Sequence, residues 1–485
     1  MKKFKQKTTK YLPDFSALFN GSSNFKTATL IRTLHALTFK GTIFFGLVLY
    51  LKNKGVSVSN IALLNTIYFL PQLFSATLVG SLSDALGDRK FFLYTAFFGS
   101  GLIFFLFPFP DWIGFFFIMR FIQGILESAI RPLTQTLVSE DSTDAERGNN
   151  VGLFKIAVYT GAMVGPMVIG FLIEHSGFKT VFFLSGFTLF AASYLSHKFI
   201  RSKNRQALGV NNDTSNHTNN SSNNSKNSSN TNIININSNQ EDKKENISLL
   251  DIYRVLPELN VKELFTEGFI FASAEKEGPR LFSPKKWKED SASLFCLITF
   301  IRRIAFNSFT TFIPLYFTTI INLSESTAGM FEGIRRLIIV MAIILSGSLA
   351  DNWGRKPLLI ISSFSCLGPI LYVLFPNLIG VWAGAATLGI TVGCFNPTSI
   401  TYMADFAPMN KHGTYLGALE SSSSLSRILG PVIGGLTAQF LGIKATFLTA
   451  GLIMSLTVPL SLLLEESVHQ LQSYELEANK EAAAN

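Results

Sequence analysis

The sequence carries few charged residues and few cysteines. Only 15% of its 485 residues are charged, whereas a soluble protein of this size carries about 25%. The three cysteines, Cys296, Cys366 and Cys394, fall in apolar runs and form no CxxC pair or Cys/His cluster. This excludes a disulfide framework and gives no reason to expect a metal. No GxxxxGK[ST] segment occurs, so the sequence has no phosphate-binding loop of that kind, and we expect no cofactor.

Long apolar runs dominate the sequence instead. Hydrophobic residues make up 48% of the chain, with 46 phenylalanines. Runs of about 20 residues, the length of a bilayer-spanning helix, recur along it. Because a chain in lipid must satisfy its own backbone hydrogen bonds, these runs predict helices. We expect twelve spans: residues 30–51, 58–82, 91–109, 112–137, 151–173 and 181–199, and then 294–317, 330–349, 358–375, 379–404, 415–441 and 445–464.

A polar segment separates the first six spans from the last six. Residues 211–239 are mostly Asn and Ser, too polar to build a core, and predict disorder. Residues 252–265 have the pattern of a short amphipathic surface helix. The chain therefore divides into a basic tail (1–27), a first six-helix bundle (28–200), a central loop (201–291), a second six-helix bundle (292–465) and a C-terminal tail (466–485).

The net charge of +9 is unevenly distributed between the two sides that the spans define. Cations precede the first span and recur in alternate loops, namely Lys2, Lys3, Lys5, Lys7, Lys10, Arg89, Lys90, Arg147, Arg355, Lys356 and Lys411. By the positive-inside rule, both termini and these loops face the cytoplasm across the cell membrane. The lipid bilayer is therefore the expected partner, and the charge gives no reason to expect nucleic acid.

One charged turn occurs twice, each time between two apolar runs. Both copies contain two glycines, an aspartate and two adjacent cations: Gly80, Asp84, Gly87, Arg89 and Lys90, and then Gly347, Asp351, Gly354, Arg355 and Lys356. The copies lie a little over half the chain apart, which indicates a duplicated membrane protein, as in carriers that rock two halves. We expect each turn to be a conformational latch, because a carboxylate at a helix end can accept from the free amides of a neighbouring helix.

A second pair of related segments supports the duplication. Small residues and prolines recur in the fifth and eleventh spans: Gly161, Gly165, Pro166 and Gly170, and then Gly430, Pro431, Gly434 and Gly435. Small residues four apart let helices approach closely, and a proline adds a bend. We expect these segments to lie at helix crossings.

Together these motifs resemble those of the major facilitator superfamily. The two turns are similar to that family's motif between helices 2 and 3 and its echo between helices 8 and 9. Arg120, Gln123 and Gly124 are similar to its Arg-x-x-Gln-Gly motif, and residues 161–170 resemble a helix-5 motif found mostly in proton-coupled drug antiporters. The resemblance implies two pseudo-symmetric six-helix bundles and transport by alternating access. One departure is Lys40, in a span where many drug antiporters carry an acidic residue.

Charges in the fourth span are candidates for proton coupling. Each costs about 2.5–3.5 kcal/mol at mid-membrane and normally faces protein or water. Arg120, Glu127 and Arg131 fall on one stripe of a helix, and Glu127 can pair with Arg131 one turn later. We predict that Glu127 is the protonatable group. Nearby cations favour its ionised form while burial disfavours it, which makes its proton affinity sensitive to conformation.

Other polar residues within the spans complete the expected substrate cavity: Lys40, Gln123, Asn307, Glu332, Arg335 and Arg336. An alternative interpretation of Glu332 and its two arginines is a set of charge pairs that lock helices together. Cations at helix starts are expected to anchor the membrane interface, namely Arg32, Arg302 and Arg303.

The sequence thus predicts an all-α secondary carrier rather than an enzyme, acting as a monomer. The expected activity is export of a small organic solute in exchange for protons. A proton-coupled uptake symporter is an alternative, and an anionic substrate fits either mode because cations outnumber carboxylates in the spans. A further alternative is a non-transporting sensor with a carrier fold that signals through the central loop.

Overall fold

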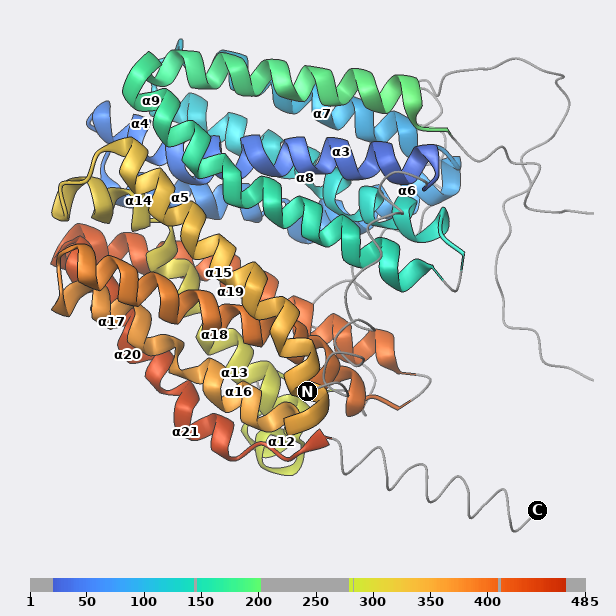
Figure 1. The fold of residues 1–485 in the computed structure, drawn as a ribbon, viewed down its shortest axis with the longest axis vertical. Coiled ribbons are helices and arrows are strands. Elements are labelled where there is room, and N and C mark those ends of the chain that lie inside the picture. The colour runs from blue at the N-terminus through green and yellow to red at the C-terminus, as the bar shows by residue number, and fades with distance from the viewer. Residues whose placement is uncertain (1–20, 144–145, 202–278, 282, 409–410, 468–485) are drawn as a thin grey trace, which may run out of the picture.

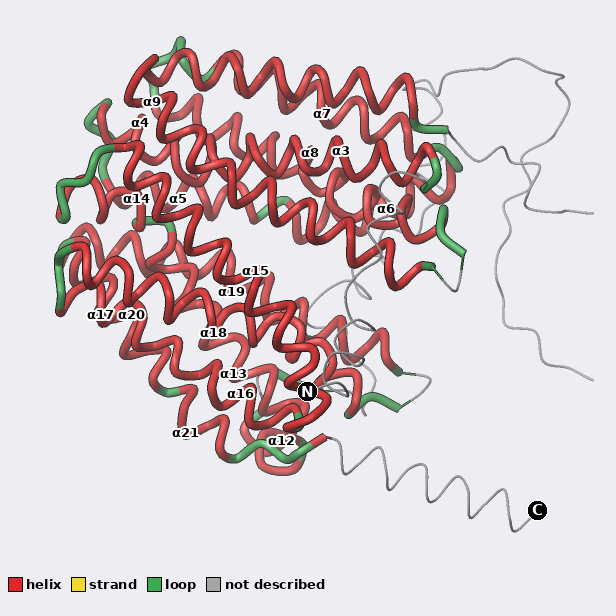
Figure 2. Tube along the Cα trace, viewed as in Figure 1, coloured by secondary structure: helices red, strands yellow, loops and turns green. Residues whose placement is uncertain are grey.

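The chain folds entirely into helices wherever the structure describes it (Figures 1 and 2). The structure is a computed structural model that describes residues 21–143, 146–201, 279–281, 283–408 and 411–467. The stretch 211–239 and the expected helix 252–265 lie outside the described residues, as does most of both tails. For the described residues, the prediction of an all-α protein is confirmed.

The first half contains the helices drawn in blue to green in Figure 1. They are α3 (Ser23–Thr38), the π-helical η1 (Phe39–Gly46), α4 (Leu47–Asn53), α5 (Val58–Phe69), α6 (Gln72–Leu86), α7 (Arg89–Leu106), α8 (Ile113–Glu140) and α9 (Arg147–Phe199). The first three follow one another without a break. α9 is interrupted at Gly177, whose φ of 78° is not helical.

The second half contains the helices drawn in yellow to red (Figure 1). They are α12 (Pro284–Glu289), α13 (Ser291–Thr310), α14 (Ile313–Leu315), η4 (Tyr316–Ile320), α15 (Glu325–Trp353), α16 (Arg355–Ser363), η5 (Phe364–Cys366), α17 (Leu367–Leu374), α18 (Leu378–Asp405), α19 (His412–Leu441), α20 (Ile443–Ser455) and α21 (Thr457–Leu462).

Several of these helices start where the sequence supplies a capping side chain. The side chain accepts a hydrogen bond from a backbone N–H in the first turn, which satisfies one of the donors that a helix leaves unpaired. Such caps are Ser22 on α3, Ser57 on α5, Asp88 on α7, Asp290 on α13, Ser324 on α15 and Asn377 on α18.

The described residues contain eight helices long and apolar enough to cross a membrane, or nine if the bent pair 58–76 and 78–86 counts as one span. One of the eight, residues 149–199, covers two of the expected spans and contains the break at Gly177. α15 and α19 coincide with two further expected spans and have 29 and 30 residues. Helices that are long and apolar enough to span a membrane are therefore present, and the number of twelve spans remains a prediction.

The two halves form two bundles that contact each other at one end and diverge toward the other (Figure 1). The two repeated turns, one between α6 and α7 and one between α15 and α16, lie at the end where the bundles diverge. We call this end the turn end. Near the opposite end, Ser326 N donates to Glu174 Oε2 at 3.0 Å and Ser59 Oγ donates to Gln439 Oε1 at 3.2 Å, each across the two halves.

Glycines line the crossings at which helices approach closely. A Cβ on Gly165 of α9 would overlap the Leu37 carbonyl oxygen of α3, and one on Gly434 of α19 would overlap the Ser308 carbonyl of α13. The same holds for the other glycines of these segments: Gly161 against Thr33, Gly170 against Glu325, Gly430 against Asn307 and Gly435 against Ala62. Pro166 and Pro431 are buried inside α9 and α19. Two of the contacts, at Gly170 and Gly435, join the two halves.

Candidate functional site

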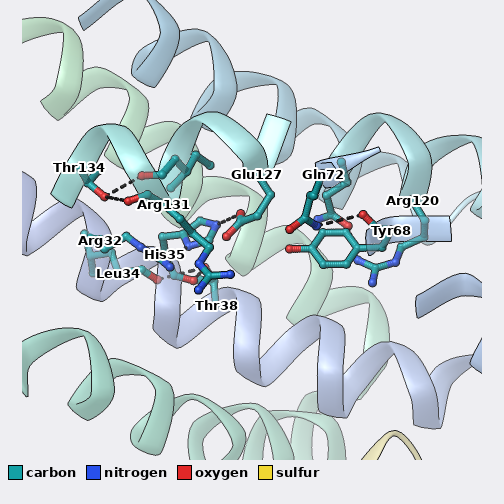
Figure 3. Close-up of polar contacts among 12 residues, drawn as sticks. Arg32, Leu34, His35, Thr38, Tyr68, Gln72, Arg120, Glu127, Arg131 and Thr134 are labelled. Carbon is teal, nitrogen blue, oxygen red and sulfur yellow. Dashed lines mark hydrogen bonds and ion pairs between the residues drawn. The ribbon is translucent and has the colours of Figure 1, made fainter. Parts of the chain in front are cut away.

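A buried carboxylate on α8 contacts a histidine on α3. Glu127 is 2% exposed and His35 is fully buried. The distance between His35 Nε2 and Glu127 Oε2 is 2.8 Å (Figure 3). Neither atom forms a hydrogen bond with any other group that the structure describes. Each is therefore the other's polar partner, in a place where an unpaired charge would be costly.

Arg32, one turn before His35 on α3, contacts the other nitrogen of the ring. Its Nη1 lies 2.5 Å from His35 Nδ1. Because a guanidinium can only donate, Nδ1 must accept, and a neutral His35 then carries its proton on Nε2, toward Glu127. The imidazole stacks on Phe39 and meets the edge of Phe97, at ring-centre distances of 5.1 and 5.7 Å. Arg32, His35 and Glu127 thus form one chain of polar contacts.

Arg120, also on α8, forms a separate polar cluster with residues of α8 and α5. Its fully buried guanidinium donates to Gln123 Oε1 at 2.6 Å and to Asn65 Oδ1 at 3.1 Å. It also lies 4.2 Å from the centre of the Tyr68 ring. Asn65 in turn donates to Thr311 Oγ1 of the second half at 3.2 Å. Arg120 is therefore linked through Asn65 to the contact between the halves.

The expected pair between Glu127 and Arg131 is not formed in this conformation. Glu127 instead contacts His35, and the side chain of Arg131 is exposed. Glu127 therefore pairs with a residue of a neighbouring helix rather than with the residue four positions later on its own helix. The sequence did not predict a role for His35, because a single histidine within an apolar run was the only available signal.

Glu332 on α15 is held by two arginines of its own helix. Arg335 donates to both carboxylate oxygens, at 2.8 and 2.6 Å, and Arg336 donates to one of them at 2.7 Å. Glu332 and Arg335 are 6% and 5% exposed. These charge pairs lie within one helix, so they do not join α15 to a neighbouring helix in the way that the alternative interpretation expected.

The remaining expected cavity residues have other contacts. Lys40 Nζ lies 4.1 Å from the centre of the Phe44 ring. Asn307 packs against Gly430 where α13 crosses α19. Arg302, expected at the membrane interface, is instead 3% exposed inside the second half, where it donates to Ser362 Oγ at 2.8 Å and to the Thr391 carbonyl at 3.1 Å. The position of Arg302 in the sequence gives no indication of these two hydrogen-bond acceptors.

The first turn is held by its own cation and by α8. Arg89 contacts Asp84 at 2.9 Å and Glu140 at 2.7 Å. The carboxylate that accepts from free helix amides is Asp88, which receives hydrogen bonds from the backbone N–H groups of Lys90 and Phe91. Gly87 has a φ of 65°, a conformation that favours glycine and allows the turn.

The second turn is capped from a distant part of the chain. Its sequence has no counterpart of Asp88 between Gly354 and Arg355. Instead, the carboxylate of Glu466 accepts from the backbone N–H groups of Arg355 and Lys356, at 2.8 and 3.1 Å. Arg355 Nε also lies 3.3 Å from Asp405 Oδ2. The side chain of Asp351 lies outside the described part of the structure, as do the surroundings of Gly347.

Comparison with known proteins agrees with this architecture. The sequence matches the profile of the Major Facilitator Superfamily over residues 29–271 and 295–483. Multidrug resistance protein MdtG of Klebsiella pneumoniae (strain 342) is 23% identical over 420 residues, which cover 84% of this chain and 85% of that protein. MdtG of Serratia proteamaculans (strain 568) is 30% identical over 200 residues, which cover 39% of this chain and 47% of that protein, about half its length.

The fold of this chain is similar to that of a solved transporter structure. A mutant of the nucleoside transporter NupG matches with a TM-score of 0.67 at 10% identity, over 91% of this chain and 100% of that one. The paired bundles, the membrane-length helices and the family match over most of the sequence lead to one conclusion. The chain belongs to the Major Facilitator Superfamily of membrane transporters.

Proposed function

We propose that this chain is a proton-coupled carrier of small organic solutes, acting as a monomer in the cell membrane by alternating access. The observation that carries the proposal is the buried contact between His35 and Glu127. A carboxylate beside an imidazole can bind and release a proton as its surroundings change with conformation. The relatives named multidrug resistance proteins support an organic solute as the cargo.

The arrangement of the halves supports alternating access. They contact each other at one end and diverge at the turn end (Figure 1). We infer that the turn end faces the cytoplasm, because the cation-rich loops gather there. This conformation is then open inward, and rocking the halves about the site opens the other side.

The contacts of His35 fit a site that has released its proton. Arg32 donates to Nδ1, which leaves the Nε2 proton of the neutral ring to point toward an ionised Glu127. A proton entering from the other side would bind the Glu127 carboxylate and neutralise it. The carboxylate would then attract nearby cations less strongly, and the balance between the two conformations would change.

We propose that the two turns act as latches at the turn end. In this conformation the exposed Asp84 contacts Arg89 of its own turn, and Arg89 also contacts Glu140 of the same half. When the turn end closes, Asp84 can exchange this contact for the helix amides of the second half. Asp351 would play the same part in the second copy.

Two modes of coupling fit this proton site, and they differ in the linkage between proton and cargo. Export in exchange for protons requires the two to compete, as a cation and a proton would compete for Glu127. The multidrug resistance relatives favour this mode. Uptake together with a proton requires each to favour binding of the other. The excess of cations around Glu127 favours this second mode for an anionic cargo.

Solute flux in liposomes that contain the purified chain, under pH gradients of both signs, tests the proposal. Exchange drives the cargo toward the acidic side, and co-transport drives it toward the alkaline side. Flux that does not respond to the gradient would contradict proton coupling. A sensor with a carrier fold would produce no flux at all.

A further inference from the structure

A buried asparagine of the first half donates a hydrogen bond to the second half. Asn65 Nδ2 of α5 lies 3.2 Å from Oγ1 of Thr311, the C-cap of α13. Both side chains are buried. The Thr311 hydroxyl donates in turn to the Asn307 carbonyl at 3.5 Å, so it is the acceptor toward Asn65. α13 leads into α14, which lies at the end opposite the turns (Figure 1); we call this the far end.

Arg120 determines which way the Asn65 amide faces. Arg120 Nη2 lies 3.1 Å from Asn65 Oδ1. Because a guanidinium can only donate, the amide atom next to it must be the oxygen, and the amide nitrogen must then face the second half. Turning the amide over would place two donors against each other and leave Thr311 without its donor. Arg120 therefore orients a hydrogen bond in which it takes no part.

The Arg120 guanidinium is itself held in place by the first half. It donates to Gln123 Oε1 at 2.6 Å, and it lies against the Tyr68 ring, 4.2 Å from the ring centre (Figure 3). The Tyr68 ring packs on Phe39 and Phe69, at ring-centre distances of 5.4 and 4.8 Å. Arg120 forms no ion pair within the described part of the chain. Because turning an acceptor away from a buried cation is costly, the acceptors of Arg120 stay oriented toward it.

Two other polar contacts between the halves at the far end are exposed. Ser59 donates to Gln439, and the backbone N–H of Ser326 donates to Glu174. Water can replace these hydrogen bonds when the halves separate, so they have little influence on the balance between conformations. A buried amide that loses its acceptor costs the full desolvation of that group. The bond from Asn65 therefore influences the closure of the far end more than these two contacts do.

We propose that Asn65 is a gating residue and that Arg120 is its positioning residue. In this conformation Arg120 points the Asn65 amide toward Thr311, and the hydrogen bond across the boundary holds the far end closed. When the far end opens, Asn65 and Thr311 move apart with their halves and the bond breaks. This inference rests on the proposed alternating access and names residues that control one of its two gates.

The pairing of the cluster allows the gate to open. Arg120 Nε and Gln123 Nε2 are buried and have no hydrogen-bond partner among the residues that the structure describes. Each buried, unpaired donor costs free energy, and water that enters when the far end opens can pair it. The closed arrangement is therefore not at its polar optimum, and the two conformations can remain close in free energy.

Removing the Thr311 hydroxyl tests the gate without a cargo or a pH gradient. Spin labels at Lys52→Cys and Lys444→Cys, exposed sites at the far end of the two halves, report their separation in phosphatidylcholine nanodiscs. The three native cysteines are buried. Thr311→Val keeps the shape of the side chain but leaves Asn65 Nδ2 unpaired while the far end is closed. We expect this variant to raise the ratio of open to closed far ends about fivefold or more.

Two matched variants separate the gate from a general effect on packing. Thr311→Ser keeps the hydroxyl and should leave the ratio at the wild-type value. Ser59→Ala removes an exposed hydrogen bond between the halves and should shift the ratio by less than about twofold. If the wild-type chain populates both distances and Thr311→Val leaves their ratio unchanged, or if Thr311→Ser shifts it equally, the gate is overturned while alternating access stands. One distance in every variant would contradict alternating access as well.

Arg120→Lys tests the positioning role. Lysine keeps the charge but lacks the planar fork that reaches Asn65 and Gln123 together, so the amide is free to turn. The variant should raise the ratio of open to closed far ends in the wild-type background. It should add little in the Thr311→Val background, because the bond that Arg120 orients is already absent there. Equal shifts in both backgrounds would show that Arg120 acts independently of the gate and would overturn its positioning role.

Discussion

His35 and Glu127 come from different helices and are 92 residues apart in the sequence, yet the Nε2 of the first lies 2.8 Å from the Oε2 of the second. Both side chains are buried, and Arg32 contacts the far side of the imidazole. A buried carboxylate with one imidazole partner can change its protonation when the helices on either side move. The relationship ties the packing of α3 against α8 to the proposed proton chemistry.

Replacing Glu127 with glutamine should abolish uphill transport driven by a pH gradient. Glutamine keeps the shape of the side chain but binds no proton at these pH values. Cargo binding should persist at least in part, because the other polar side chains of the first half are unchanged. The measurement is flux against an imposed gradient, with binding measured separately. Uphill transport at the wild-type rate would move the coupling site away from Glu127.

His35→Gln tests the histidine independently. Glutamine can still donate a hydrogen bond to Glu127, but it has no second ring nitrogen that can accept from Arg32. We expect the pH profile of the flux to be displaced, because the surroundings of the Glu127 carboxylate change, while some downhill exchange of cargo remains. His175→Gln is the matched control, because His175 is exposed and its ring contacts Phe171 of its own helix. An unchanged pH profile in His35→Gln would limit this residue to a packing role.

Local patterns in the sequence predicted the features that depend on neighbouring residues. Gly87 and Gly354 adopt positive φ in the two turns, and the glycines of α9 and α19 lie at close helix crossings. The contact between Glu332 and Arg336 follows the i, i+4 spacing on one helix face. In each case the geometry is fixed within a few residues, or by the absence of a side chain at a crossing.

Features that depend on packing between helices were missed. The sequence suggested that Glu127 pairs with Arg131, but His35 of α3 takes that position. Arg302 was expected at the membrane interface, but its acceptors lie 60 and 89 residues further along the chain. The cap that Glu466 supplies to α16 comes from 111 residues beyond Arg355. Such partners follow from the relative rotation of helices, which one sequence does not specify.

Glycine substitutions should separate tight crossings from open positions. Gly165→Leu places a side chain where a Cβ alone already overlaps the Leu37 carbonyl, so it should force α9 away from α3 and stop transport. Gly329→Leu should have a similar effect at the crossing between the halves, where Gly329 meets Pro166. Gly152→Leu, also on α9, meets no atom within 4 Å of its Cβ and should be tolerated. Equal flux in all three variants would contradict this interpretation of the crossings.

Neutralising the turn aspartates should impair transport without preventing expression. Asp84→Asn removes the charge that holds Arg89 in this conformation and that we expect to hold the second half in the other. Asp351→Asn should act in the same way. Because Asp84 is exposed, the fold should not depend on it. Transport rate and membrane abundance are measured together, and wild-type rates in both variants would refute the latch.

The pair of Lys54 and Asp111 should not contribute to pH dependence near neutrality. These residues lie outside the spans, with 2.5 Å between Lys54 Nζ and Asp111 Oδ1. The hydrogen bond from Lys54 lowers the pKa of Asp111 below its usual value. A lowered carboxyl pKa stabilises the fold above the unfolded value of about 3.9 and loses this effect as the pH falls through the folded pKa. Asp111→Asn should therefore leave the pH profile of transport between pH 5 and about 8 unchanged; a displaced profile would assign part of it to this pair.

Removing the Glu466 carboxylate should destabilise the second half at the turn end. Glu466 accepts from two backbone N–H groups at the start of α16, a helix whose own turn supplies no capping aspartate. Loss of such a cap costs about 0.5–2 kcal/mol, so Glu466→Gln should lower the melting temperature of the purified chain. Glu465→Gln is the matched control, since the hydrogen bonds of Glu465 use its backbone. If the latch in this half needs an ordered start of α16, Glu466→Gln should also slow transport and Glu465→Gln should not. Equal melting temperatures for the two variants would show that the cap contributes nothing measurable to stability.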